Sequence, residues 1–397
     1  MAQNAAHATE DREGGIKVKN INRLGTPCFL LDLDKLEQNI QEMANLCQAN
    51  GKKLCPMVKT HKSGEIAALQ AAQGADSFLA GTIDEAEMLV SSGYRSIVFP
   101  YPIIGAANIA RVMALSQTAQ IMVSFDGIEA AAQWDKYLQQ ERRTIEYLVI
   151  IDCGLGRLGV LPEQVLSLVQ GLQAFSQLNF RGIATHPGQV YGKSTPTEVR
   201  SVAEDEIRAL QTAHDLLSQA GFSVAVVATG STPTAPFTAQ SPLITTLRPG
   251  NYVFYDAIQV ALGVVPPQRC SFTILATIIA HPVSDRFIMD AGSKCFGLDK
   301  GAHGAQSVTG YGIVKGHPEV WVEGLSEEVG KLRISHPTTL QVGDTIEIIP
   351  NHACAAANMT NYVVAHRNGV AERLIAINAR GGSKPPLFTS ANSSTAK

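Results

Sequence analysis

Short apolar runs alternate with helical periodicity along most of the first two thirds of the chain, and this alternation limits the fold most. The runs interpreted as strands are 54–59, 76–81, 96–101, 120–125, 145–152, 179–186, 223–229 and 244–248. The segments with helical spacing are 63–73, 83–93, 105–116, 127–141, 162–175 and 195–220. Because parallel strands need helical crossovers and eight such strands close a sheet, the pattern predicts an α/β fold with a (β/α)₈ barrel over residues 26–266. A doubly wound open sheet is the alternative, weakened because no G-x-G-x-x-G follows the first strand.

The pattern changes after Val264-Val265-Pro266-Pro267, where long helical periodicity ends. The β-rich runs that follow are 272–279, 286–290, 320–322, 345–349 and 361–364. They predict a C-terminal, mostly antiparallel β domain over residues 267–383, with 1–25 and 384–397 as loose tails. The early strand 26–33 fits either domain. Asp34 is expected to cap the helix that follows it, with Glu37 completing a capping box.

Composition excludes several classes of function. The chain has 397 residues and a net charge of -3, so it offers no basic footprint for nucleic acid. Its seven cysteines form no C-x-x-C pair, which favours a reducing, cytoplasmic compartment over a disulfide framework. Neither a signal peptide nor an apolar run long enough to span a bilayer is apparent, so we expect no membrane partner.

Several polar groups are predicted to meet at one end of the barrel. Lys59 follows the first strand of the barrel, where partial desolvation would favour Schiff-base formation. The segment 230–234, Gly-Ser-Thr-Pro-Thr, offers hydroxyls and backbone amides for a phosphate, and 248–252 follows the eighth strand. Arg157 and His186 also follow strands. An aldehyde cofactor that carries a phosphate would use all of these groups, and pyridoxal 5'-phosphate (PLP) is the candidate.

A histidine and a cysteine stand two positions apart at 352 and 354. On extended backbone both side chains project to the same side, so both could reach one ion. Imidazole with thiolate suits Zn²⁺, and Mn²⁺ or Mg²⁺ would need waters or carboxylates as further ligands. A half-buried histidine beside a core cysteine is the alternative interpretation of His352 and Cys354.

Taken together, these stretches resemble the family of D-threonine aldolases and eukaryotic-type D-serine dehydratases, which are fold-type III PLP enzymes related to alanine racemase. The matching stretches run in order from about residue 25 to 380: 56–62, 152–159, 230–234, 248–254, 290–294, 310–312, 325–328 and 350–354. The resemblance implies that Lys59 joins PLP through a Schiff base. It further implies that the cofactor contacts Arg157, Tyr191, Gly230, Ser231, Thr232 and Tyr252. It also implies a divalent ion on His352 and Cys354 and a homodimer in which each site is closed by the partner.

Three departures from the family pattern are visible. Met57 and Val329 stand where the family usually has histidines, and many aldolases differ at 185–188, Thr-His-Pro-Gly. The altered histidines are candidate acid–base groups, so substrate choice is expected to have shifted.

The resemblance implies a lyase for D-configured 3-hydroxy amino acids, of the D-threonine aldolase type. The ion would lower the pKa of the substrate's β-hydroxyl, a base, either His61 or a metal-bound hydroxide, would take its proton, and the Cα–Cβ bond would break. His186 is a further catalytic candidate. If Lys59 instead takes the Cα proton, the outcome is dehydration, as in a D-serine or D-3-hydroxyaspartate dehydratase. An amino-acid racemase, with Tyr311 as second base, and a non-catalytic PLP carrier remain further alternatives.

Overall fold

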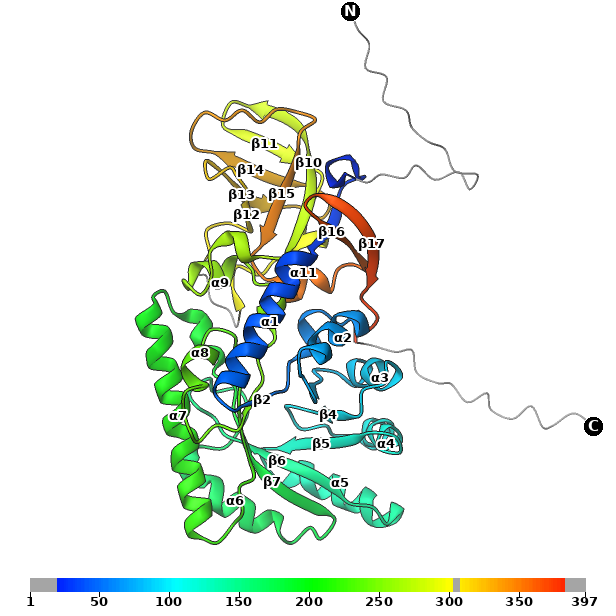
Figure 1. Cartoon of the computed structure of the whole chain (residues 1–397), viewed down its shortest axis with the longest axis vertical. Coiled ribbons are helices and arrows are strands. Elements are labelled where there is room, and N and C mark those ends of the chain that lie inside the picture. The colour runs from blue at the N-terminus through cyan, green and yellow to red at the C-terminus, as the bar shows by residue number, and fades with distance from the viewer. Residues whose placement is uncertain (1–19, 303–307, 383–397) are drawn as a thin grey trace, which may run out of the picture.

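The computed structural model describes residues 20–302 and 308–382, and it contains two β-sheets with helices arranged around one of them (Figure 1). The predicted tails at 384–397 and before residue 20 lie outside the described residues. No helix in the described ranges is both long and apolar enough to cross a membrane.

The first sheet has eight strands in the order β2-β9-β8-β7-β6-β5-β4-β3, and each pair of neighbours is parallel. A parallel bridge between Met57, in the segment that continues β2, and Leu79 of β3 closes the ring. The barrel prediction is therefore confirmed, and the open sheet is excluded. The strands are β2 (Lys53–Leu54), β3 (Phe78–Leu79), β4 (Ser96–Val98), β5 (Gln120–Phe125), β6 (Ile145–Ile150), β7 (Leu178–Ala184), β8 (Val226–Thr229) and β9 (Thr246–Leu247).

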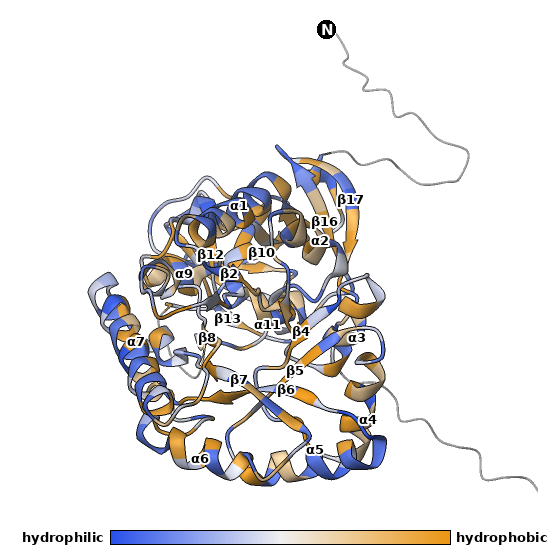
Figure 2. Cartoon of the chain, turned by 60° about the horizontal axis from the view of Figure 1, so that its bottom comes forward, coloured by the Kyte–Doolittle hydropathy of each residue, from blue (hydrophilic) through white to orange (hydrophobic). Residues whose placement is uncertain are grey.

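Helices surround this barrel with their apolar faces turned inward (Figure 2). In the longest, α7, the Thr195 side chain caps the first turn, and Leu210, Ala213 and Leu217 are buried. Gly221 follows its end with a positive φ of 84°. The helices are α2 (Gly64–Ala72), α3 (Ile83–Ser91), α4 (Ala106–Leu115), α5 (Ile128–Glu141), α6 (Val165–Leu172), α7 (Pro196–Gln219), α8 (Ala235–Thr238) and α9 (Ala257–Ala261).

The second sheet has nine strands in the order β11-β14-β13-β12-β15-β10-β1-β16-β17, mostly antiparallel, and β10 also pairs with β11. It includes β1 (Cys28–Asp32), which pairs with β10 on one side and β16 on the other. The early strand therefore belongs to the β domain. The other strands are β10 (Phe272–Val283), β11 (Arg286–Met289), β12 (Gly312–Val314), β13 (Val320–Leu325), β14 (Gly330–Ile334), β15 (Thr345–Pro350), β16 (Tyr362–Arg367) and β17 (Val370–Ala376).

Helix α1 (Leu33–Ala49) runs from the β domain to the barrel (Figure 1). Its N-cap is Asp32, whose carboxylate accepts from the Lys35 N–H, so the expectation that Asp34 caps it is wrong. The helix begins earlier than predicted because Asp32 still has extended backbone at the end of β1. Asp34 and Glu37 lie on the helix surface and form ion pairs with Arg367 of β16. These pairs tie α1 to the second sheet.

Candidate functional site

A cavity of about 530 Å³ lies where the carboxyl ends of the barrel strands face the β domain. Most of its lining comes from the segments that follow β2, β3, β4, β6, β7, β8 and β9, and the rest comes from α9 and the start of α11 (Ala353–Ala357). The cavity brings together nine residues singled out from the sequence: Lys59, Arg157, His186, Tyr191, Gly230, Ser231, Thr232, His352 and Cys354.

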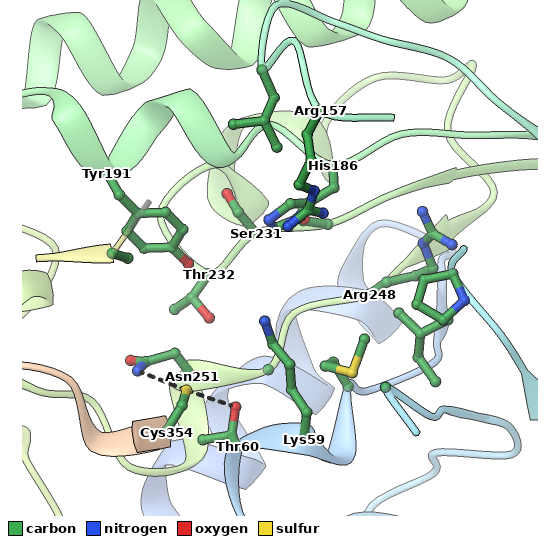
Figure 3. Close-up of a pocket in the computed structure, with 18 of the residues that line it drawn as sticks. Lys59, Thr60, Arg157, His186, Tyr191, Ser231, Thr232, Arg248, Asn251 and Cys354 are labelled. Carbon is green, nitrogen blue, oxygen red and sulfur yellow. Dashed lines mark hydrogen bonds between the residues drawn. The ribbon is translucent and has the colours of Figure 1, made fainter. Parts of the chain in front are cut away.

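Lys59 reaches the cavity because β2 is short. Four residues beyond its end at Leu54, the chain enters a 3₁₀ turn, Val58–Thr60, in which Val58 and Thr60 are buried and Lys59 is exposed. Its side chain rises into the cavity (Figure 3). Gly81 lies against the lysine, since a Cβ there would stand 3.1 Å from the Lys59 Cβ, and the Gly81 N–H donates to Glu85 at 2.6 Å. The hydrogen bond to Glu85 thus fixes the Gly81 backbone, which packs against Lys59 on the β3 side of the cavity.

The loop after β8 is built to approach another group closely. A Cβ on Gly230 would stand 2.6 Å from the Arg248 carbonyl oxygen, so only glycine fits. The His186 Nδ1–H donates to the Gly230 carbonyl at 2.5 Å. The Thr232 hydroxyl oxygen accepts from the Tyr252 N–H at 3.1 Å, which leaves its hydrogen to donate to a further acceptor. Backbone amides and hydroxyls of this kind fit a phosphate.

Arg248 supplies a buried positive charge beside that loop. One guanidinium nitrogen, Nη2, donates to the Thr185 carbonyl at 2.9 Å. Its Nε and Nη1 have no hydrogen-bond partner among the described residues, although the side chain is only 7% exposed and lines the cavity. Orphaned buried donors are costly, so this arginine fits a bound group that carries acceptors. A phosphorylated aldehyde with polar ring substituents is such a group.

Arg157 and Tyr191 flank the cavity from two further loops. Arg157 is exposed on the loop after β6, whose turn is fixed by the Asp152 carboxylate accepting from the Gly154 and Gly156 N–H groups at 2.9 and 3.1 Å. Tyr191 lies in the 3₁₀ segment Gly188–Gly192, and burial raises the pKa of its phenol. The phenol therefore stays protonated.

His352 and Cys354 lie together at the side of the cavity formed by the β domain. The His352 Nδ1 lies 2.8 Å from Asp299 Oδ2, which orients the ring, and Cys354 Sγ lies 3.3 Å from the Thr60 hydroxyl (Figure 3). Burial acts to raise the pKa of the Cys354 thiol, but the positive charges of His352 and Lys59 and the hydrogen bond to His352 together outweigh it, so the pKa is lowered.

No group of three or more His, Cys, Asp or Glu side chains suited to a metal occurs within 20–302 and 308–382. The His352 imidazole and the Cys354 sulfur are of the ligand types that Zn²⁺ takes, and an ion held by these two alone would need further ligands from water or substrate.

His61 and Tyr252 are not brought to the cavity. His61 is fully buried, its Nδ1 accepts from the Ser63 N–H at 3.2 Å, and its Nε2 therefore donates to Gln70 Oε1 at 3.2 Å. Burial lowers its pKa to about 4, so the ring is neutral. The Tyr252 hydroxyl accepts from Gln70 Nε2 at 2.8 Å. Both side chains join one internal network, and only the Tyr252 backbone N–H contacts the loop after β8, through the Thr232 hydroxyl.

The two positions where the sequence departs from the family pattern have different surroundings. Met57 lines the cavity beside Gly250, whose Cβ would stand 3.1 Å from the Met57 Cβ. Val329 lies in the turn between β13 and β14, where its carbonyl accepts from the Ser326 N–H at 2.9 Å, and it does not line the cavity. Of the two, Met57 is the one placed to affect a ligand.

Three residues of the site carried no sequence signal of their own. Asp299 orients His352, Thr60 contacts Cys354, and Asp256 accepts from the Ala353 and Gln259 N–H groups at 3.0 and 3.1 Å beside them. Asp299 belongs to a loop without periodicity, and its contact spans 53 positions of the chain.

Comparison with known proteins shows which families this chain is similar to. The model of the alanine racemase N-terminal domain matches residues 31–257, and that of a putative serine dehydratase domain matches 271–366. D-threonine aldolase of an Arthrobacter species is 29% identical, covering 91% of this chain and 94% of its own. D-threo-3-hydroxyaspartate dehydratase of Delftia sp. strain HT23 is 30% identical, covering 84% and 91%. D-serine dehydratase of Dictyostelium discoideum is 27% identical, covering 86% and 93%.

Solved structures agree with these relatives. The Delftia dehydratase superposes with a TM-score of 0.84 at 28% identity, covering 90% of this chain and 99% of its own. Structures of D-threo-3-hydroxyaspartate dehydratase also include one variant with a histidine replaced by alanine and another with a cysteine two positions later replaced, the latter in a metal-free form. The chain therefore belongs to the alanine racemase-like, fold-type III family of PLP enzymes that contains the D-threonine aldolases and D-serine dehydratases, and it is a lyase.

Proposed function

We propose that the protein is a PLP- and divalent-metal-dependent lyase that cleaves D-3-hydroxy amino acids, with D-threonine yielding glycine and acetaldehyde. One observation carries the proposal. The Lys59 amine shares a single cavity with the Gly230–Thr232 loop and with the His352 and Cys354 side chains. An amine, an anion-binding loop and a metal pair are what such chemistry requires.

The residues that would hold the two groups follow from their surroundings. The loop 230–232, with Gly250 and Asn251, would hold the phosphate, Arg248 would donate to acceptors of the cofactor, and Lys59 would bind its aldehyde carbon. His352 and Cys354 would bind the metal. When bound, PLP supplies an electron sink for a bond broken at Cα, and the ion supplies a Lewis acid for the β-hydroxyl.

The chain's own side chains then divide the remaining tasks. Arg157, an exposed guanidinium at the mouth of the cavity, would pair with the substrate carboxylate in addition to the contact with the cofactor expected from the sequence. Thr60 keeps Cys354 in place. Lys59 Nζ is the group placed to move a proton at Cα. His61 cannot take the β-hydroxyl proton, because it is fully buried away from the cavity.

The cavity wall supports a substrate with an uncharged side chain. The wall formed by the ends of β2, β3, β4 and β6 is largely apolar, with the side chains of Met57, Leu79, Pro100, Ile150, Leu155 and Leu158. A second carboxylate against this wall would be desolvated, with Arg157 already assigned to the first one. This favours D-threonine over D-3-hydroxyaspartate, and the Arthrobacter aldolase is consistent with that choice.

Dehydration is the second candidate function, and the position of His61 favours it. With His61 excluded, cleavage of Cα–Cβ is left with only one of the two bases expected, a metal-bound hydroxide, whereas dehydration needs a proton removed at Cα, which the Lys59 amine would take. The 30% identical Delftia dehydratase is consistent with this alternative.

Racemisation and simple cofactor carriage receive less support. Tyr311, the expected second base of a racemase, does not line the cavity of its own chain. A carrier needs no second domain, whereas here the segment 352–354 of the β domain forms part of the cavity wall.

Product analysis distinguishes these functions. Purified protein is incubated with D-threonine, D-serine and D-threo-3-hydroxyaspartate, with and without EDTA. Acetaldehyde and glycine from D-threonine, lost with EDTA and restored by Zn²⁺ or Mn²⁺, support the proposal. Pyruvate and ammonia from D-serine indicate a dehydratase, and L-isomers indicate a racemase. Bound PLP without turnover indicates a carrier.

We further propose that the chain forms a homodimer. Leu158, which lines the cavity, is 38% exposed, and Leu161 on the same loop is 53% exposed. A second copy of the chain would cover these side chains together with the open side of the cavity. Light scattering coupled to size-exclusion chromatography measures the mass directly.

A further inference from the structure

Glu206 is a carboxyl residue inside the protein that none of the roles above uses. It lies on the inner face of α7 and is fully buried, between the helix and the loop that follows β8. Its carboxyl lies beside the Thr234 hydroxyl and the Gly230 N–H. Both belong to the segment Gly230–Thr234, so Glu206 lies behind the proposed phosphate loop, while the cavity lies in front of it.

The surroundings of Glu206 do not suit a negative charge. Neither carboxyl oxygen has a well-formed hydrogen bond or an ion pair within the described residues. Arg248 is the cation that interacts electrostatically with Glu206. Its side chain, however, lines the cavity and donates to the Thr185 carbonyl rather than to Glu206. The other titratable group that faces it is Cys153, whose thiol is itself neutral because burial raises its pKa to about 12. An isolated buried carboxylate is expensive, so the neutral acid is the expected form.

The loop in front of Glu206 has a different neighbour on each side. The Gly230 carbonyl accepts from His186, while the Gly230 N–H is turned toward Glu206. Further along, the Ser231 and Thr234 hydroxyls are bonded to each other at 2.9 Å. The Gly230–Thr232 backbone is therefore bonded to His186 on one side and lies, without a well-formed hydrogen bond, against the buried Glu206 carboxyl on the other.

We propose that Glu206 is a positioning residue for PLP, which supports the phosphate loop as a neutral carboxylic acid and weakens phosphate binding when it loses its proton. This inference rests on the proposed function, because it requires that the loop binds the cofactor's phosphate. Ionised Glu206 would place a negative charge directly behind a dianion in a dry environment, where charge repulsion is strong. Consistent with this, burial raises the pKa of Glu206 to about 8.

The test is the PLP dissociation constant of the full-length chain, measured by absorbance titration of cofactor-free protein at pH 6.5 and pH 9.5, on either side of that pKa. We expect the wild-type constant to rise about tenfold more across this range than that of Glu206→Gln, which has the same shape and no titrating proton. Glu204→Gln is the matched control, since Glu204 lies on the same helix with its side chain 60% exposed. It should follow the wild type.

A pH profile of Glu206→Gln identical to that of the wild type would overturn the inference. Thermal unfolding of the cofactor-free proteins gives a readout that needs no PLP. The folded wild type holds a proton on Glu206 that the unfolded chain releases above its usual pKa of about 4.3, so stability falls as the pH rises from there to about 8. The melting temperature of Glu206→Gln should therefore exceed that of the wild type by a margin that grows over this range.

Should Glu206→Gln fail to fold, the titration of Glu206 can be measured by NMR in wild-type protein labelled with carbon-13 at its glutamate carboxyls. One carboxyl resonance should titrate near pH 8, and its absence would contradict the inference. If no form of the protein binds PLP, the proposed function fails. If PLP binds without the difference between the wild type and Glu206→Gln, only the role of Glu206 fails.

Discussion

At the scale of single residues, Lys59 and His61 show how two side chains only two positions apart acquire different roles. The 3₁₀ turn Val58–Thr60 exposes Lys59 to the cavity, and the chain then turns so that His61 is fully buried against Gln70. Spacing along a strand could not separate the two, because the strand ends before either residue.

Replacement of Lys59 tests the cofactor directly. Lys59→Ala should lose the visible absorbance of a protein-bound Schiff base and lower kcat by at least about 10²–10⁴-fold, because it removes both the attachment point and the group placed at Cα. Spectra and steady-state rates measure this. Lys53→Ala, on the exposed side of β2, is the control and should keep both. A fully coloured, active Lys59→Ala would refute the proposed site.

Replacement of His61 tests its exclusion as a base. His61→Gln should lower the free energy of unfolding by about 1–3 kcal/mol, because it disturbs the buried bonds to Ser63 and Gln70. The pH profile of kcat/KM should stay as in the wild type. If the decrease of kcat/KM at acidic pH were lost in His61→Gln while the melting temperature stayed unchanged, His61 would instead have a catalytic role.

The sequence allowed the prediction of site residues that follow strands, and for a physical reason. Lys59, His186 and the 230–232 loop each follow a barrel strand, and parallel strands deliver their carboxyl ends to one face. Asp299 and Glu206 were not predicted, because contacts across 53 positions and burial on a helix facing a distant loop leave no local pattern. The direction of the Tyr252 side chain was likewise decided by tertiary packing.

At the scale of elements, strand positions follow from apolar runs, while strand pairing depends on backbone detail. Each predicted barrel run contains or borders an observed strand, yet β2, β3 and β9 have only two paired residues each. In the β domain, β12, β14 and β17 were not foreseen. β17 has mostly exposed side chains at the sheet edge, so no hydrophobic alternation marks it.

Gly182 shows how the pairing of two barrel strands depends on the backbone at a single residue. It has a φ of +152° in β7, and a Cβ there would stand 1.9 Å from the Val226 carbonyl oxygen of β8. Gly182→Ala should therefore destabilise the protein by more than about 3 kcal/mol, measured by urea unfolding. Gly192→Ala, where nothing lies within 4 Å of the added Cβ, should be nearly neutral. Equal stability of the two variants would contradict the close approach of β7 and β8.

At the scale of the whole molecule, a lysine in a buried ion pair of the barrel also bonds to the end of the β domain. Lys62 Nζ lies 2.8 Å from Glu85 Oε1, with the Glu85 side chain fully buried. The Lys62 carbonyl accepts from the Ala379 N–H at 3.0 Å, and its amine donates to the Ala379 carbonyl. The same lysine thus holds α3 and the segment that follows β17.

Removal of one member of this pair should be worse than removal of both. Lys62→Met leaves the Glu85 charge buried alone and should lower the free energy of unfolding by about 3–5 kcal/mol. Lys62→Met combined with Glu85→Gln should recover part of that loss, as determined by a double-mutant cycle in urea. Strictly additive effects would mean that the two groups do not interact.

The placement of β1 has a consequence for synthesis of the chain. Leu30 pairs with Thr273 on one side and with Val364 on the other. Both partner strands of β1 are therefore synthesised long after β1 itself. On a ribosome the barrel could close while Leu30 and Leu31, both fully buried in the finished protein, are still without neighbours. An apolar segment that stays unpaired during synthesis is expected to bind chaperones. The speed of translation through the last third of the messenger RNA would determine how long it stays exposed.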